Sequence, residues 1–540
     1  MEKVLLVAIN ARYRHSNLAI RYLRNYNNDL NYRIELLETS LKQDRQTILS
    51  AIYHHHPDII GFSVYIWNSN IYKLLIADVK KVLPNCKIIL GGPEVTYSAS
   101  FWLEEFKDID YIVKGAGEEG FRYILTNWPT EKIVCQPNPE FQSLPFPYLP
   151  QDFLELDSKY IYYETSRGCP FNCSYCLSSR QDDPLRYRSW QQIKEELTYL
   201  ICKNPKIIKF VDRTFNANRK LSRKIWQFLL DKETTTKFHF EIHPNLLGKE
   251  DFDLLQQAKK NKFQFEIGIQ TTNLRTLKAI NRAEPYQREN VKKLIEMKKF
   301  HIHVDLIVGL PYEGIVSLQN TFNNVHSLGA DHLQVGFLKI LAGTKMAEQK
   351  EEFQLQYQQN APYKILQNRW LSYEEINLLE SMENIQNLLY NSGNFSTLLF
   401  YAIPLFESAF HFYKNITENW KNIPVVPRNW QKVAYLLYLF FKKNLPHKLN
   451  LILDTMRWDW CKLASGHYYP DFLANHKLVQ AKKYGFNYLK QQLQSWSRTD
   501  FTYSQLRQAI FFQKSSTEFH NCQCNEIVCF LPNGKKIKFQ

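Results

Sequence analysis

The sequence predicts an α/β protein with two successive parallel-sheet regions and a mostly helical C-terminal region. Residues 1–130 and 159–345 each alternate continuous apolar runs with helix-like segments, the pattern of repeated βα units. A proline-rich stretch at 131–158 reads as a linker between them. In residues 346–540, apolar and aromatic side chains recur at spacings of three and four over 373–389 and 430–441, which predicts amphipathic helices.

The sequence of the N-terminal region predicts a doubly wound, flavodoxin-like sheet. Its continuous apolar runs indicate strands that are buried on both faces, as in a parallel sheet covered by helices. Ser16 or Asn17 is suited to cap the first helix. The expected strands are 4–9, 32–37, 58–64, 87–90 and 111–113, and the expected helices are 18–26, 46–54, 71–83 and 118–125.

Small and polar residues follow the strands of this first sheet. Ligands on such sheets bind beyond the carboxyl ends of the strands, and glycine there lets the backbone approach a bulky ligand. No G-x-G-x-x-G follows the first strand, which argues against a dinucleotide. The candidate ligand-binding residues are His15, Ser63, Gly91, Gly92, Pro93, Gly117 and Glu118.

The central region repeats a strand and a helix six times. Polar groups stand at or near the ends of several of its strands, among them Asp212, Glu241 and Gln270. In barrels of βα units the active site lies at the carboxyl ends of the strands, so these side chains are expected to face one site. The expected strands are 160–165, 207–211, 238–242, 263–269, 303–308 and 332–338.

Three cysteines follow the first strand of the central region, at Cys169, Cys173 and Cys176. The spacing C-x3-C-x2-C supplies three thiolates to a cubane [4Fe–4S] cluster and leaves its fourth iron open to another ligand. A structural zinc site is the alternative, but it needs a fourth ligand and no second Cys or His pair lies nearby.

This motif resembles the signature of radical SAM enzymes, including the aromatic Tyr175 before the third cysteine. The resemblance implies a partial (β/α)6 TIM barrel whose open iron binds S-adenosylmethionine (SAM). It also implies that Glu241 and Gln270 hydrogen-bond SAM, that Arg282 pairs with the SAM carboxylate, and that Asp212 serves SAM or substrate. A guanidinium suits bidentate pairing with a carboxylate.

The N-terminal region resembles the cobalamin-binding domain that precedes many radical SAM domains. Gly91-Gly92-Pro93 and Gly117-Glu118 match its pattern. The D-x-H-x-x-G motif, whose histidine ligates cobalt, is absent, and His15 stands in a different context. The resemblance implies cobalamin at His15, Ser63 and these two turns. A vestigial scaffold domain is the alternative.

The C-terminal region, 346–540, resembles an uncharacterised domain attached to some cobalamin-type radical SAM proteins, on the segment 361–373. It indicates no chemistry of its own. Cys522, Cys524 and Cys529 near the end have a spacing that is not standard for a metal site, so both a metal and a purely structural interpretation stay open.

The composition of the chain restricts where in the cell the protein is expected and which partners it is expected to bind. The apolar run 434–441 is far shorter than the roughly 20 residues of a membrane span, and the N-terminus reads as a strand and not a signal peptide. Ten cysteines, three of them in the cluster motif, suit a reducing compartment, so we expect a cytoplasmic protein. The net charge of +15 leaves nucleic acid open as a partner, although the basic residues are dispersed.

The resemblance implies a radical SAM enzyme that reductively cleaves SAM at a [4Fe–4S] cluster and forms a 5′-deoxyadenosyl radical. Cobalamin-dependent methylation of an unactivated carbon is the leading expectation. Cobalamin-independent radical cyclisation or oxidation, and RNA modification such as methylthiolation, are the alternatives. The substrate would be a small molecule, lipid, tetrapyrrole or peptide, and an external one-electron reductant is needed. No side chain is assigned as an acid–base catalyst.

Overall fold

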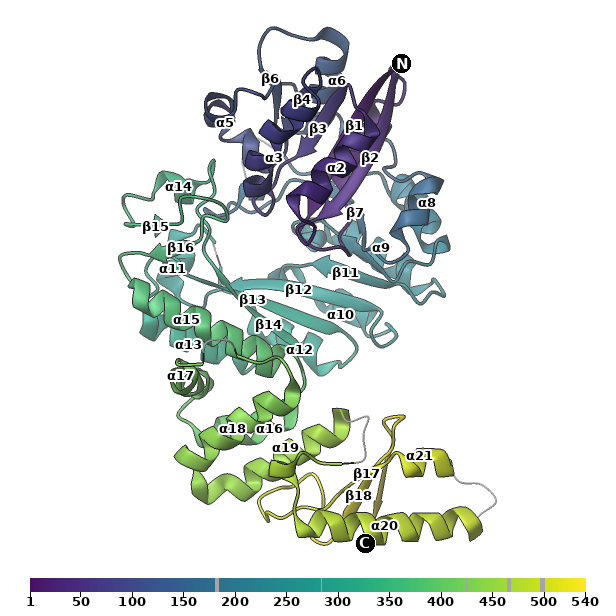
Figure 1. The fold of residues 1–540 in the computed structure, drawn as a ribbon, viewed down its shortest axis with the longest axis vertical. Helices are drawn as coiled ribbons and strands as arrows, with labels where there is room; N and C mark the ends of the chain where they lie inside the picture. The colour runs from purple at the N-terminus through teal and green to yellow at the C-terminus, as the bar shows by residue number, and fades with distance from the viewer. Residues whose placement is uncertain (180–183, 283, 424–425, 464–467, 496–500) are drawn as a thin grey trace. The chain divides into compact units, whose positions relative to one another are not determined.

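The computed structural model of the chain describes residues 1–179, 184–282, 284–423, 426–463, 468–495 and 501–540. The chain divides into two compact units (Figure 1). The first holds nearly all residues up to Ile376. The second holds Asn377–Gln540 together with two short segments, Phe322–Ser327 and Asp331–Leu333.

The first unit opens with a six-stranded sheet in the order β2-β1-β3-β4-β5-β6, and every neighbouring pair is parallel. The strand order reverses between β1 and β3, which creates the crevice where ligands bind on sheets of this type. The strands are β1 (Glu2–Asn10), β2 (Tyr32–Ser40), β3 (Ile59–Ser63), β4 (Lys87–Gly91), β5 (Tyr111–Lys114) and β6 (Ile133–Cys135).

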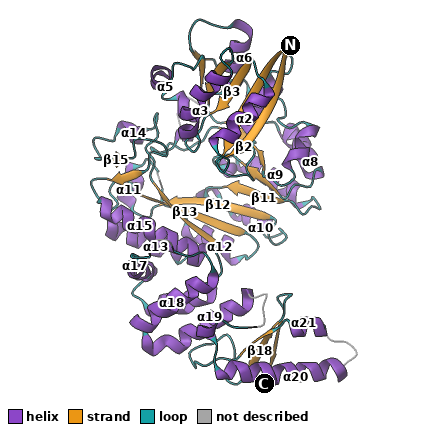
Figure 2. Ribbon diagram, viewed as in Figure 1, coloured by secondary structure: helices purple, strands orange, loops and turns teal. Residues whose placement is uncertain are grey.

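Apolar side chains of β1 alternate between the two faces of this sheet. Leu5, Val7 and Ile9 belong to one core with residues of α2 (Arg45–His55), α3 (Ser69–Val82) and α5 (Ala99–Glu105). Val4, Leu6 and Ala8 belong to the opposite core with residues of α1 (Leu18–Tyr26) and α6 (Gly117–Asn127). Helices thus cover both faces, and the predicted doubly wound sheet is confirmed (Figure 2).

The proline-rich segment differs in one respect from the expected linker. Its start forms β6, which completes the first sheet beside β5. The rest lies against α1: Phe141 and Leu144 pack on Tyr22, and the Asp152 carboxylate accepts two hydrogen bonds of 2.7 Å from Arg24. These contacts hold the segment in place on the first sheet's helical layer.

The central region forms a second sheet of six strands, in the order β14-β13-β12-β11-β10-β7. The neighbouring strands from β7 to β13 pair in parallel, and helices alternate with the strands along the chain, as expected for a partial barrel. The strands are β7 (Ile161–Tyr163), β10 (Ile207–Phe210), β11 (Lys237–Glu241), β12 (Phe263–Gln270), β13 (His301–Val308) and β14 (His332–Phe337). The helices are α8 (Trp190–Cys202), α9 (Arg219–Leu230), α10 (Lys249–Leu255), α11 (Leu274–Ala279), α12 (Arg288–Glu296) and α13 (Ile315–His326).

A short antiparallel pair, β8 (Ser166–Arg167) and β9 (Arg186–Tyr187), brackets the three-cysteine segment. The first unit ends in the segment with α14 (Lys345–Glu348), β15 (Gln356–Tyr357) and β16 (Ile365–Gln367). This segment contacts the first sheet's layer: Asn70 donates to the Ala361 carbonyl at 2.9 Å, and the Tyr363 hydroxyl donates to Glu94. The N-terminal and central regions are therefore also connected through residues that follow β14.

The second unit is mostly helical, as predicted, and ends in an antiparallel sheet of β17 (Ile510–Phe512), β18 (Ile527–Phe530) and β19 (Lys536–Phe539). Cys522 and Cys529 are buried in two different apolar clusters of this unit, and Cys524 is exposed. No helix among the described residues is long and apolar enough to cross a membrane. The helices are α15 (Tyr373–Gln386), α16 (Ser396–Ala402), α17 (Ala409–Trp420), α18 (Trp430–Asn444), α19 (Leu449–Leu463), α20 (His476–Ser495) and α21 (Tyr503–Arg507).

Candidate functional site

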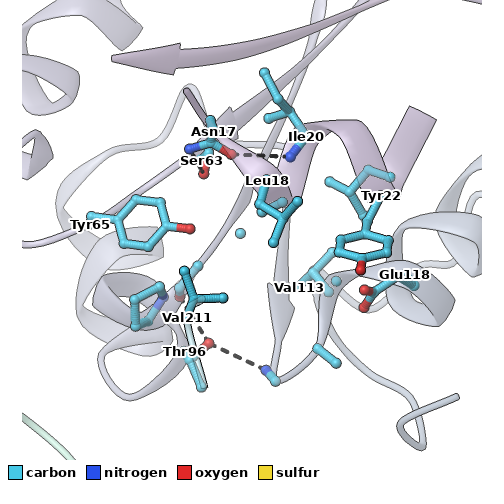
Figure 3. Close-up of a pocket in the computed structure, with 18 of the residues that line it drawn as sticks. Asn17, Leu18, Ile20, Tyr22, Ser63, Tyr65, Thr96, Val113, Glu118 and Val211 are labelled. Carbon is cyan, nitrogen blue, oxygen red and sulfur yellow. Dashed lines mark hydrogen bonds between the residues drawn. The ribbon is translucent and has the colours of Figure 1, made fainter. Parts of the chain in front are cut away.

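A cavity of about 780 Å³ lies at the carboxyl ends of the first sheet (Figure 3). Its wall also includes Glu164, Ser166, Arg167 and Gly168, which lead into the three-cysteine segment, and Val211 and Arg213 after β10. Both sheets of the first unit therefore contribute to one chamber. All seven residues proposed from the sequence for cobalamin line it: His15, Ser63, Gly91, Gly92, Pro93, Gly117 and Glu118.

Glycine is required at the turn between β4 and α4 (Pro93–Thr96). Gly92 has φ +115° and ψ 171°, a conformation that is essentially restricted to glycine. A Cβ on Gly92 would meet the backbone oxygen of Val64 at 2.4 Å. The turn therefore packs directly on the backbone that follows β3.

His15 lies on the loop between β1 and α1, with its ring among aromatic side chains of the central region. Its Nδ1 is 2.6 Å from the Tyr162 hydroxyl, and its ring stacks on Tyr162 and meets Tyr160 edge-on. Burial, followed by the positive charges of Lys209 and Arg12, lowers the pKa of His15, which favours the neutral imidazole. His15 thus joins the first sheet's loop to β7.

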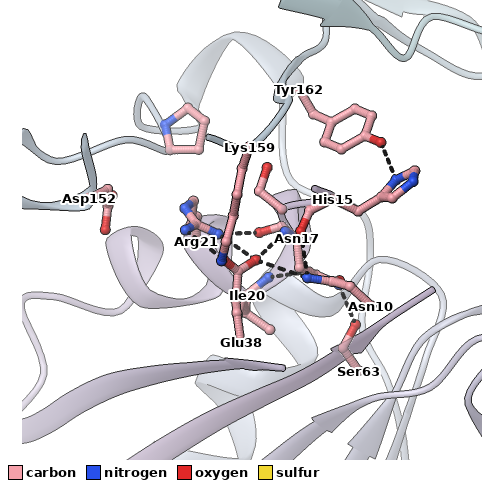
Figure 4. Close-up of polar contacts among 12 residues, drawn as sticks. Asn10, His15, Asn17, Ile20, Arg21, Glu38, Ser63, Asp152, Lys159 and Tyr162 are labelled. Carbon is pink, nitrogen blue, oxygen red and sulfur yellow. Dashed lines mark hydrogen bonds and ion pairs between the residues drawn. The ribbon is translucent and has the colours of Figure 1, made fainter. Parts of the chain in front are cut away.

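A buried ion-pair network supports the start of α1 beside the cavity (Figure 4). The Glu38 carboxylate pairs with both Arg21 terminal nitrogens at 2.9 and 3.0 Å and with Lys159 Nζ at 3.1 Å. It also accepts from the backbone of Asn17, whose side chain caps α1 and reaches Ser63. Burial by itself would raise the pKa of Glu38, but Arg21 and Lys159 hold it below its usual value. Glu38 therefore stays charged and fixes the cavity wall.

The three cysteines form no disulfide bond, and their sulfur atoms interact electrostatically with one another. Cys173 is buried, and Cys169 and Cys176 are partly exposed. The Thr214 hydroxyl lies 3.7 Å from Cys169 Sγ, and the Tyr175 hydroxyl interacts with Cys173. Burial raises the pKa of Cys169 and of Cys173. The segment thus presents three sulfur ligands from one short loop.

Asp212 is buried and its hydrogen bonds hold the chain just before the cysteines. Its carboxylate accepts from the Thr165 backbone at 3.1 Å, the Thr165 hydroxyl at 2.6 Å and the Ser166 hydroxyl at 2.5 Å. Burial raises the pKa of Asp212 to about 6. We propose that Asp212 positions the three-cysteine segment; the predicted role toward SAM stays a prediction.

The other residues proposed for SAM lie on β11, on β12 and in the loop that follows α11. Gln270 ends β12 with φ +69°, and its buried Oε1 has no hydrogen-bond partner among the described residues. Arg282 donates to the Gly268 carbonyl on the same strand, and its other terminal nitrogen is 4.0 Å from Cys173 Sγ. Glu241 ends β11, and burial raises its pKa to about 7 despite the opposing charge of Arg213. Arg282 thus connects the end of β12 with the cysteines.

Glu118 and Arg167 link the two halves of the cavity wall. Arg167 Nη2 is 2.8 Å from Glu118 Oε1 and 2.7 Å from Glu164 Oε1, and all three side chains are largely buried. Glu118 lies in the first turn of α6, which covers the first sheet, whereas Arg167 lies two residues before Cys169. A cavity-lining helix of the first sheet is therefore ion-paired to the backbone segment that carries the cysteines.

Comparison with known families divides the chain into three matched regions. Residues 4–125 match the B12 binding domain, residues 163–325 match the radical SAM superfamily, and residues 351–528 match a family described as a protein of unknown function (DUF4080). The chain is a radical SAM enzyme with a B12-binding domain. The first two matches cover the two sheets whose strand ends form the cavity.

Known relatives include an uncharacterized methyltransferase of Pyrococcus horikoshii, 27% identical over 334 residues, which are 56% of this chain and 71% of the relative. The cobalamin-dependent radical SAM methyltransferase TokK of Streptomyces tokunonensis is 24% identical over 311 residues, 51% of this chain but only 45% of TokK. The structure of the cobalamin-dependent SAM radical enzyme OxsB, with aqua-cobalamin and SAM bound, has a TM-score of 0.59 at 15% identity. It covers 93% of this chain and 82% of OxsB, which shows a shared fold.

The residues of this B12-binding radical SAM enzyme fit the three cofactors that its family matches imply. Three cysteines on one loop, none of them in a disulfide bond, suit a [4Fe–4S] cluster with one open iron. The unpartnered, buried Gln270 Oε1 beside Arg282 suits a hydrogen-bonding ligand such as SAM. A large cavity with a glycine turn at its wall suits cobalamin. None of the five residues proposed for SAM lines that cavity, so the two groups of residues form adjoining parts of the site.

Sequence reasoning missed several cavity residues of this enzyme. Tyr65 and Trp67, whose rings stack with centroids 4.3 Å apart, follow β3 directly and line the cavity. The rule that ligands bind at strand ends could have indicated them, because Ser63 was selected on that basis. Arg167 stands two residues before the cysteine motif, but its pairing with Glu118 joins residues far apart in sequence and leaves no local signal.

Replacing Glu118 by glutamine should weaken the connection between the B12-binding domain and the cysteine segment. Loss of the charged hydrogen bond to buried Arg167 should lower the free energy of unfolding by about 1.5–3 kcal/mol. Iron content should be retained, because Glu164 still pairs with Arg167. Urea unfolding and iron analysis of the full-length protein measure both effects. Glu105→Gln, on an exposed position of α5, is the matched control; equal stabilities of the two variants would refute the connection.

Proposed function

We propose that this enzyme is a cobalamin-dependent radical SAM methyltransferase that methylates an unactivated carbon of a small-molecule substrate. The observation that carries the proposal is the shared cavity, whose wall combines the strand ends of the B12-binding domain with residues leading into the cysteine motif. The names of the two methyltransferase relatives support the same reaction. When bound, the cluster supplies an electron to SAM and cobalamin supplies a methyl carrier.

The chain's own residues would bind and orient the cofactors and would exclude water from the site. Cys169, Cys173 and Cys176 would hold the cluster, and Arg282, beside Cys173, would pair with the SAM carboxylate. Glu241 and Gln270 would hydrogen-bond SAM from the ends of two adjacent strands. The glycine turn at Gly92 would admit the corrin ring, with residues of both regions closing the chamber around it.

The proposal includes an external one-electron reductant and a reducing compartment, the cytoplasm. None of the ten cysteines is in a disulfide bond, which suits such conditions. Methylthiolation of RNA is less favoured. By resemblance, those enzymes carry three further cysteines in their N-terminal domain, whereas residues 1–158 here contain only Cys86 and Cys135. Cys86 is buried, and burial raises its pKa to about 12, so it is a poor iron ligand.

Anaerobic titration of cobalamin into the reconstituted full-length protein tests the proposal. We expect tight binding with the absorption spectrum of a base-off form lacking a histidine ligand, because the D-x-H-x-x-G motif, whose histidine ligates cobalt, is absent from the sequence. His15→Ala should weaken binding by removing part of the cavity wall and leave the spectrum of the bound form unchanged. Failure to bind cobalamin would refute the methyltransferase proposal and favour radical chemistry without cobalt.

A further inference from the structure

The interior face of the central sheet carries a layer of titratable side chains. Along β12 and β13, buried apolar residues alternate with partly exposed ones. The apolar set, with Phe263 and Phe265 among it, packs with Trp226 of α9 and forms the outer core. The alternate set on β11, β12 and β13 includes His239, Glu241, Glu266, His303 and Asp305. Adjacent strands therefore bring acidic groups and imidazoles together on one face of the central sheet.

Strand register places these groups side by side. Glu266 on β12 is the register partner of Glu241 on β11 and of His303 on β13. Its Oε2 lies 3.1 Å from His239 Nε2 and 4.0 Å from His303 Nδ1. His303 Nε2 lies 3.0 Å from Asp305 Oδ1. The line His239–Glu266–His303–Asp305 is thus continuous across three strands.

The buried carboxylates of this cluster favour a cation beside them. His239 is 9% exposed, and its Nδ1 has no hydrogen-bond partner among the described residues. Three carboxylates, those of Glu241, Glu266 and Asp305, interact within the group. The carboxylates therefore favour positive charge at this position, although Lys209 on β10 already contributes one nearby cation.

We propose that Glu266, His303 and Asp305, supported by His239, bind one divalent transition-metal ion inside the partial barrel, separately from the three-cysteine motif. One ligand atom from each of the three residues can be chosen such that all lie within 4.8 Å of one another. Imidazole nitrogen with carboxylate oxygen is a donor set for Mn²⁺, Fe²⁺, Co²⁺ or Zn²⁺. Two neighbouring strands, β12 and β13, supply the three ligands, so little backbone rearrangement is needed to bring them around an ion.

Mn²⁺ is a suitable probe, because hard ions avoid thiolates and the free ion has a strong EPR signal. The full-length protein with its cluster reconstituted and oxidised is treated with chelator, desalted and titrated with Mn²⁺. We expect loss of the free-ion signal at a stoichiometry of one, and recovery of the signal when Zn²⁺, which is higher in the affinity order, displaces Mn²⁺. His303→Gln and Glu266→Gln should each weaken Mn²⁺ binding by at least about tenfold.

The double variant Glu35→Gln/His55→Gln is the matched control. Glu35 and His55 form a similar carboxylate–imidazole pair at 2.8 Å in the B12-binding domain, away from this cluster. It should bind Mn²⁺ like the wild type. Asp305→Asn supplies a third test if another variant does not fold, as judged by thermal unfolding. The proposal would be overturned if the wild-type protein binds neither Mn²⁺ nor Zn²⁺ at one ion per chain. It would also be overturned if the folded variants bind both ions with wild-type affinity. Either result would mean that these residues form only an ion-paired network.

Discussion

Cys173→Ala is expected to prevent formation of a [4Fe–4S] cluster and to reduce SAM cleavage to background. The cluster would lose one of its three protein ligands, and the remaining two thiolates cannot hold a cubane with a single open iron. Cys173 is the buried member of the motif and lies 4.0 Å from Arg282, so its loss also alters the contact with the end of β12. Iron and sulfide analysis after anaerobic reconstitution measures the first effect, and 5′-deoxyadenosine formation with reductant measures the second.

Cys202→Ala is the control for this experiment. Cys202 is an exposed cysteine at the end of α8, outside the motif, and its replacement should leave iron content and SAM cleavage at wild-type values. Wild-type iron content in Cys173→Ala would mean that the cluster ligands lie elsewhere. Loss of iron in both variants would instead indicate that iron binds to surface thiols without a defined site.

Long apolar strands and their order along the chain could be predicted from the sequence. The run 4–9 is buried throughout in β1, and each expected strand of the central region overlaps an observed one. By contrast, β6 has only three residues beside a proline-rich stretch, so it leaves no periodic signal. The sequence also does not predict α4 and α5. The helix α4 has four residues and begins at Pro93, directly after two glycines, and α5 has only seven residues.

The cavity could be anticipated from strand ends, since side chains that follow neighbouring parallel strands meet at one edge. The charged residues that support the cavity wall could not be predicted from the sequence. The strand predicted from the sequence ends at Leu37, one residue before Glu38. The Glu38 side chain can be buried because it pairs with Arg21 and with Lys159, and Lys159 is 121 residues away along the chain. Asp212 stands at a strand end as predicted, yet only the fold shows that its carboxylate faces Thr165 and Ser166. Pairings between distant segments have no local pattern.

Gly92→Ala is expected to abolish tight cobalamin binding while the protein still folds. The backbone conformation at Gly92 costs a residue with a Cβ about 1–3 kcal/mol. The new Cβ would also lie 2.4 Å from the Val64 carbonyl oxygen, so the turn or the chain after β3 must move. Because both segments line the cavity through residues such as Ser63 and Pro93, that movement changes the shape of the proposed corrin site. Anaerobic cobalamin titration and urea unfolding measure the two effects.

Gly329→Ala separates conformational strain from the loss of cavity shape. Gly329 also has a positive φ, +70°, but a Cβ there would meet nothing within 4 Å. This variant should lose about 1–2 kcal/mol of stability from the left-handed conformation alone and bind cobalamin like the wild type. If Gly92→Ala also keeps wild-type cobalamin affinity, the β4–α4 turn does not contact the corrin. If Gly329→Ala loses affinity equally, the effect reflects stability and not the shape of the cavity.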